Sequence, residues 1–167
     1  MGVQSGELPR CNGRMIALWR VRTGLGVDAG GVYAGAGLYP SQGVHAAALS
    51  TTDGSTVWRQ KLDVSPQGYW LASQTMLFIP TGRGNPIGLD RNTGRLAKTF
   101  AGAGGAFAVL LEDELFSGTG NDGTLTANPV KSSGSLATFK GNALAASPRH
   151  SFGPAQRPVG HVWRSRC

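Results

Sequence analysis

Three short polar turns, each closed by a glycine, recur every 40 residues along the chain. They read Thr52-Asp53-Gly54, Asn92-Thr93-Gly94 and Ser132-Ser133-Gly134. An earlier turn at Gly13 stands 41 residues before Gly54, so the chain holds about three periods. A period near 40 residues is typical of proteins that repeat one supersecondary unit.

The residues around each turn indicate that the repeating unit consists of strands. A strand-like stretch directly precedes each turn; these stretches are residues 44–49, 86–89 and 123–127. Before each of these stretches stands an apolar strand that enters a glycine, at residues 32–35, 76–82 and 114–118. A further strand is expected after each of the periodic glycines Gly24, Gly68 and Gly105. The apolar runs are short, and no helical period is sustained. The unit is therefore predicted to be a four-stranded antiparallel meander, the size of a propeller blade.

The expected fold class is all-β, with about three four-stranded antiparallel blades of an incomplete β-propeller in residues 1–141. The chain has 167 residues, of which 40% are hydrophobic, enough for one domain with a core. Residues 142–167 contain three prolines and lack the next turn of the repeat, so we expect an irregular tail outside the repeat. An open arc leaves blade surface uncovered, which predicts the remaining blades of a parent chain as partners, or self-association.

Charge and composition exclude several classes of function. The net charge is +7, but the basic residues are dispersed, so no nucleic-acid partner is expected. No apolar run is long enough for a membrane span. Cys11 and Cys167 and the three histidines lack metal-ligand spacing, so no metal site is predicted. The G-x-G-x-x-G at residues 118–123 is followed by a β-leaning stretch, and is interpreted as a turn between strands.

The first two turns carry more than a glycine. Residues 48–58 read Ala-Leu-Ser-Thr-Thr-Asp-Gly-Ser-Thr-Val-Trp, which resembles the A-x-D-x-x-T-G-K-x-x-W repeat of pyrroloquinoline-quinone-type (PQQ-like) β-propellers. The next copy keeps Asp90 and Thr93-Gly94 but has Lys98 where the family has tryptophan, while the first copy has Ser50 in place of the aspartate. Over residues 14–141 the chain resembles large bacterial PQQ-like repeat proteins of planctomycete-type genomes.

The resemblance implies roles for particular residues. In this family the tryptophan of one blade packs against the next blade, so Trp58 is expected to be a docking residue and Gly54, Gly94 and Gly134 to be structural. Trp19 and Trp70 are expected in the core. The resemblance also implies a periplasmic or exported protein. Pyrroloquinoline quinone is implied only for dehydrogenase members, which hold it with calcium, an aspartate base and adjacent cysteines. No such residues are identified here, so no catalytic residue and no cofactor are predicted.

A ligand site is predicted at the mouth of the propeller channel. Arg22, Gln67 and Tyr69 lie beside the periodic glycines, and Arg83 and Asn85 lie on a neighbouring turn. Such side chains can hydrogen-bond an anionic or sugar-like ligand, or instead satisfy backbone carbonyls around the channel. The predicted function is a non-enzymatic binding or scaffold surface for a protein or small ligand. The alternative is a fragment of a PQQ-dependent quinoprotein oxidoreductase whose catalytic blades are missing.

Overall fold

The chain is built almost wholly from β-strands. The computed structural model describes residues 10–11, 14–15, 21, 23–37, 39–82, 84–102, 105, 107–118, 123–141, 145–147, 150–152 and 163–164. In these residues the single helical element is one 3₁₀ turn, η1 (Pro40–Gln42). The all-β fold class is confirmed.

Three four-stranded antiparallel sheets form the blades, each with its strands in chain order. The first blade contains β3 (Gly26–Asp28), β4 (Gly31–Ala36), β5 (Val44–Leu49) and β6 (Thr56–Leu62). The second contains β7 (Leu71–Ala72), β8 (Met76–Ile79), β9 (Ile87–Asp90) and β10 (Leu96–Thr99). The third contains β11 (Phe107–Leu111), β12 (Glu114–Gly118), β13 (Thr124–Pro129) and β14 (Ala137–Lys140).

Shorter strands flank the three blades. At the N-terminal end, β1 (Arg10–Cys11) pairs with β2 (Arg14–Met15) across the predicted turn at Gly13, which itself lies outside the described residues. At the C-terminal end, β15 (Ala145–Ser147), β16 (His150–Phe152) and β17 (Trp163–Arg164) form a three-stranded sheet. These three strands were not predicted from the sequence. The division of the chain at residue 141 stays a prediction.

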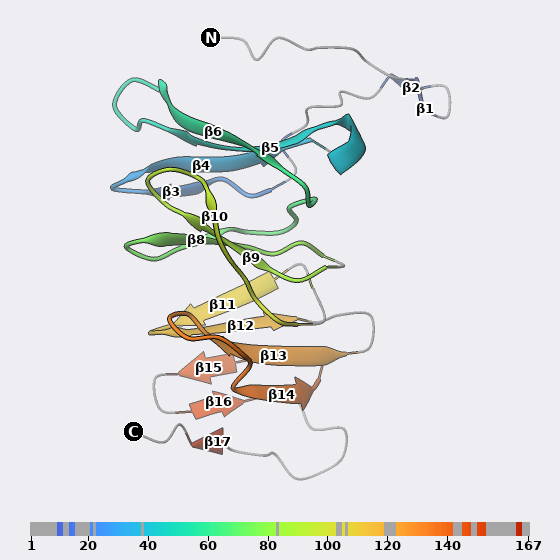
Figure 1. Cartoon of the computed structure of the whole chain (residues 1–167), viewed down its shortest axis with the longest axis vertical. Coiled ribbons are helices and arrows are strands. Elements are labelled where there is room, and N and C mark those ends of the chain that lie inside the picture. The colour runs from blue at the N-terminus through green and yellow to red at the C-terminus, as the bar shows by residue number, and fades with distance from the viewer. Residues whose placement is uncertain are drawn as a thin grey trace.

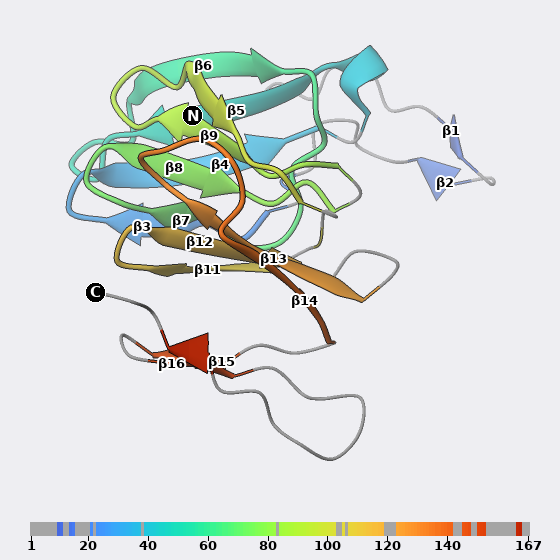
Figure 2. The same ribbon diagram turned by 60° about the horizontal axis from the view of Figure 1, so that its bottom comes forward.

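The sheets are stacked one after another along the long axis of the molecule (Figure 1). The first blade lies near the N-terminal end of the stack, and β15–β17 lies at the opposite end. After a turn of the view, β15 and β16 still lie far from β6 and β5 of the first blade (Figure 2). The stack is therefore an open arc of propeller blades and not a closed ring.

The repeated turns are built from side-chain acceptors and a left-handed glycine. Asp90 Oδ1 accepts hydrogen bonds from the N–H of Asn92 (3.1 Å) and from the N–H and hydroxyl of Thr93 (both 2.8 Å). In the first blade Ser50 Oγ takes the place of that carboxylate and accepts from two backbone N–H groups. The closing glycines have φ of +70° at Gly54 and Gly94 and of +97° at Gly134, values that favour glycine. The glycine period thus marks a backbone requirement.

The hydrophobic core lies between the blades. We call the side of a blade that faces the preceding blade its upstream face, and the other side its downstream face. Between the first and second blades, buried side chains pack in one cluster: Tyr33, Val44, Ala46, Ala48, Trp58, Leu62, Trp70, Leu77, Ile79, Ile87 and Leu89. A smaller cluster between the second and third blades contains Phe78, Phe100 and Leu115. Each sheet is thus stabilised by its neighbours in the stack.

Candidate functional site

The outer strand of the first blade contacts the glycine turn of the second blade through Trp58. The Trp58 side chain is buried, and its indole N–H donates to the carbonyl of Arg91 at 2.9 Å. A Cβ atom placed on Gly94 would lie 2.4 Å from Cε3 of this ring, so the ring occupies the space that a side chain would need. Next along the same strand, the Gln60 amide donates to the carbonyl of Thr93 at 3.1 Å. The docking role that the PQQ-like resemblance implies for Trp58 stays a prediction.

Lys98 occupies the equivalent place between the second and third blades. Its ammonium donates to three backbone carbonyls of the third blade's turn, those of Pro129 (2.5 Å), Val130 (3.0 Å) and Ser132 (2.6 Å). It also lies 4.7 Å from the centre of the Phe100 ring. Desolvation in this half-buried position lowers the pKa of Lys98 from its usual value. The second contact between blades is therefore polar where the first is aromatic.

Arg91 ties the turn of the second blade to the first blade. Its guanidinium donates to the Tyr33 hydroxyl at 2.7 Å, to the Ser73 carbonyl at 2.8 Å and to the Asp28 carboxylate at 2.5 Å. Asp28 and Tyr33 belong to the first blade, more than 50 residues before Arg91 in the chain. The planar guanidinium group suits this bridging role because its five N–H donors can reach three acceptors at fixed angles. No local sequence signal indicates these partners.

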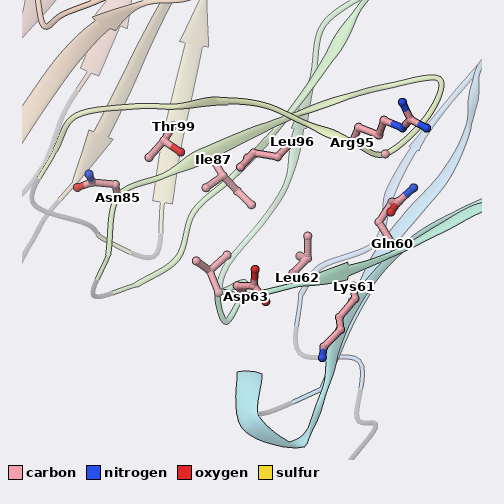
Figure 3. A pocket seen from close by; sticks show the side chains of 11 residues that line it. Gln60, Lys61, Leu62, Asp63, Asn85, Ile87, Arg95, Leu96 and Thr99 are labelled. Atoms are coloured by element: carbon pink, nitrogen blue, oxygen red, sulfur yellow. The ribbon is translucent and has the colours of Figure 1, made fainter.

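A pocket of about 390 Å³ opens between the outer strands of the first and second blades. We call it the inter-blade groove. Its walls come from β6 and the residues after it, and from β9 and β10 (Figure 3). The lining residues are Gln60, Lys61, Leu62, Asp63, Val64, Asn85, Ile87, Gly94, Arg95, Leu96 and Thr99.

The groove combines an apolar wall with polar groups at its edges. Leu62 and Ile87 are buried at its base, whereas the Leu96 side chain is 63% exposed. In Figure 3, Leu62, Ile87 and Leu96 face the space between the strands, and Lys61 and Arg95 extend away from it. Its volume falls within the range of ligand pockets, which typically join apolar walls to a few polar groups.

The residues predicted for the channel mouth do not all come together. Asn85 lines the groove, whereas Gln67 and Tyr69 are not among its lining residues. The Gln67 side chain lies over Gly82, where an added Cβ would be 2.4 Å from its Oε1. The Tyr69 ring lies against Gly24 and remains 77% exposed. Both residues stand just before β7, the strand expected after Gly68.

Two predicted site residues, Arg22 and Arg83, lie outside the described residues, as does Trp19. Trp70 is buried in the cluster between the first two blades. The G-x-G-x-x-G at residues 118–123 is followed by a strand, β13, that pairs with the preceding β12; its residues 119–122 lie outside the described residues.

In the described residues, no group of three or more His, Cys, Asp or Glu side chains is arranged to hold a metal ion. In the same residues, none of the helical structure is long and apolar enough to cross a membrane.

Comparisons with known proteins show the fold. No protein-family model matches the chain, and no curated protein matches its sequence. Among solved structures, BamB from Moraxella catarrhalis aligns with a TM-score of 0.65 and 18% identity, over 80% of this chain and 43% of BamB. The computationally designed Ika4 protein aligns with a TM-score of 0.67 and 15% identity, over 98% of this chain and 99% of its own. A europium-containing methanol dehydrogenase aligns with a TM-score of 0.56 and 18% identity, over 74% of this chain and 25% of its own.

These likenesses establish a β-propeller-like fold of stacked antiparallel blades. The chain spans less than half the length of BamB and a quarter of the dehydrogenase. At such low identities a structural likeness indicates the fold alone. Membership of the PQQ-like repeat family stays a prediction.

Proposed function

We propose that this chain is a non-enzymatic β-propeller segment that binds an extended peptide segment of a partner protein in the inter-blade groove. The observation that carries the proposal is the groove itself, a 390 Å³ space with an apolar wall between the outer strands of two blades. Leu96 supports it because a leucine that is 63% exposed at the mouth of a pocket offers apolar surface to a ligand.

The position of the strands favours a peptide over a compact ligand. β10 is the outermost strand of the second blade and β6 the outermost strand of the first. The outer edge of such a strand presents backbone donors and acceptors, to which an extended peptide can add by β-augmentation. An apolar side chain of the peptide would enter between Leu62, Ile87 and Leu96, with the Asn85 amide and the Asp63 carboxylate available for its polar groups.

A second surface stays open at the channel mouth. Gln67, Tyr69 and Asn85, with Arg22 and Arg83, remain proposed ligand contacts there. The exposed ring of Tyr69 favours this surface because aromatic rings are common in binding sites. The two surfaces share Asn85, so substitutions at Leu96 and at Gln67 distinguish them better than any change at Asn85.

Selection of random peptides displayed on phage against the full chain tests the groove. Leu96→Asp places a charge on its apolar wall, and Leu136→Asp is a matched control. Leu136 stands 40 residues later, at the equivalent place in the third blade, and is similarly exposed at 55%. We expect selected peptides with a recurrent apolar residue that bind the wild type and the Leu136→Asp variant, but bind the Leu96→Asp variant at least tenfold more weakly. Peptides that bind all three proteins equally would refute the groove as the site.

The oxidoreductase alternative has its own test. Calorimetric titration of the full chain with pyrroloquinoline quinone and calcium would give measurable heat if these blades formed part of a quinone site. We expect no saturable binding. Saturable binding that Gln67→Ala weakens would favour the quinoprotein alternative and the channel mouth. A periplasmic or exported location, which the PQQ-like resemblance implies, is proposed on that resemblance alone.

A further inference from the structure

The upstream face of the third blade is polar at positions where the upstream face of the second blade is apolar. On β8 and β9 four paired positions are buried against the first blade: Leu77 with Leu89, and Ile79 with Ile87. In the same register, β12 and β13 of the third blade pair Leu115 with Asn128 and Ser117 with Thr126. These four side chains are buried as well. Three polar side chains therefore stand where the contact between the first two blades has leucine or isoleucine.

Two of these buried polar side chains have an atom without a hydrogen-bond partner in the described part of the chain, Ser117 Oγ and Asn128 Oδ1. The Asn128 amide N–H donates to the Ala101 carbonyl at 2.7 Å, so one end of the amide is satisfied and the other is not. Ser117 Oγ lies 3.3 Å from the position of a Cβ added to Gly102, so it faces the segment between the second and third blades. A buried polar atom without a partner costs free energy only while the blade is docked, because water reaches the atom once the blade opens.

The contact at the outer strands of these two blades is also polar. Lys98 donates to the carbonyls of Pro129, Val130 and Ser132, and it occupies the place that Trp58 holds between the first two blades. Water can replace these hydrogen bonds when the blades separate, whereas it cannot replace the apolar burial of an indole ring. Both parts of the contact between the second and third blades thus hold less strongly than their counterparts between the first and second.

In proteins built from stacked repeats, stability is approximately the sum of the repeats and of their contacts with neighbours, so the weakest contact opens first. The buried clusters of this chain lie between blades, so a blade that undocks also loses the packing that stabilises its sheet. We infer that the third blade opens and unfolds as a unit while the first and second blades stay docked. This opening would expose Phe78 and Phe100, which are buried between the second and third blades.

This inference concerns a different contact from the inter-blade groove and does not depend on the proposed function. Native-state hydrogen–deuterium exchange of the full chain tests it. The first blade is the internal comparison, because it docks on the other side of the second blade. We expect the amides of the central strands β12 and β13 to have protection factors at least tenfold lower than those of β5 and β8.

Two variants should move the opening in opposite directions. Ser117→Ala removes an unpartnered buried hydroxyl and should raise protection in β12 and β13 at least threefold. Lys98→Met removes the donor to three carbonyls and should lower that protection at least fivefold, with β5 unchanged. Ser135→Ala and Lys131→Met are the matched controls, because they make the same changes at exposed positions of the third blade. Lys131 forms only an exposed ion pair with Asp113, so both controls should leave protection unchanged.

The comparison of strands within the wild type does not depend on whether any variant folds. Protection in β12 and β13 equal to that in β5 and β8 would overturn the inference. So would a loss of protection by Lys98→Met that is equal in all three blades, because the chain would then open as a single unit.

Discussion

Gly54 and Gly94 provide a natural control for the contact between blades. Both glycines close the same turn and have the same φ of +70°. They differ in their surroundings: an added Cβ meets no described atom within 4 Å at Gly54, but would lie 2.4 Å from Cε3 of Trp58 and 2.8 Å from Cγ of Gln60 at Gly94. Replacing each glycine by alanine therefore separates the cost of the backbone from the cost of overpacking.

The expected magnitudes follow from these two terms. A left-handed residue with a Cβ costs about 1–2 kcal/mol, and this term applies to both variants. Overpacking against a well-packed neighbour adds about 1–3 kcal/mol, and this term applies only at Gly94. Gly54→Ala should thus lower the free energy of unfolding by about 1–2 kcal/mol, and Gly94→Ala by about 2–5 kcal/mol.

Urea unfolding followed by circular dichroism measures both values, and a double-mutant cycle identifies the cause. If the Trp58 ring is responsible, Gly94→Ala should cost much less in a Trp58→Ala background, because the ring that clashes is gone. Equal losses for Gly54→Ala and Gly94→Ala, or an unchanged cost in the Trp58→Ala background, would refute the placement of Trp58 on this turn.

Three further predictions concern the contacts between blades and the turn of the first blade. Trp58→Ala should lower the free energy of unfolding by about 3–5 kcal/mol, and Trp58→Phe should lower it by about 1 kcal/mol through loss of the hydrogen bond to the Arg91 carbonyl. Urea unfolding of each variant measures both values. Similar losses for the two variants would show that ring packing contributes little. Lys98→Met removes the donor to three carbonyls of the third blade and should lower the free energy of unfolding by about 1–3 kcal/mol. A melting temperature equal to that of the wild type would contradict this expected loss. Hydrogen bonds from Ser50 and then Ser55 lower the pKa of Asp53 from 3.8 to about 2, so the stability it contributes is present above pH 4 and is lost as pH falls from 3.8 toward 2. Asp53→Asn should flatten the pH dependence of the urea midpoint in that range, and an unaltered dependence would show that the carboxylate is not held this way.

The regular part of the fold could be predicted from the sequence because its signals are local. The glycine period placed the three turns, and the strand predicted at residues 44–49 is β5 (Val44–Leu49). The strand predicted at residues 114–118 is β12. A turn that needs positive φ restricts its residue type strongly, and alternating apolar residues reveal the strands that it joins. Both features can be recognised without knowledge of distant contacts.

Apart from the docking role expected for Trp58, the contacts between blades could not be predicted from local signals. Arg91 binds Asp28 and Tyr33, which are distant in sequence and belong to a different sheet. The groove also depends on how two sheets splay apart at their outer strands, which no spacing in the sequence records. In the tail, the prolines suggested irregular structure, but strands of two or three residues form before, between and after them. Asn85 was selected for the channel mouth, and the structure adds that it lines the groove.

Hydrogen–deuterium exchange of the full chain, with and without a peptide selected on it, tests the proposed binding surface most directly. We expect the peptide to slow exchange in residues 60–64 and 94–99, which line the groove, and to leave residues 67–69 and the equivalent strand of the third blade, β14, unchanged. Protection at residues 67–69 without protection at 94–99 would contradict the groove and place the ligand at the channel mouth.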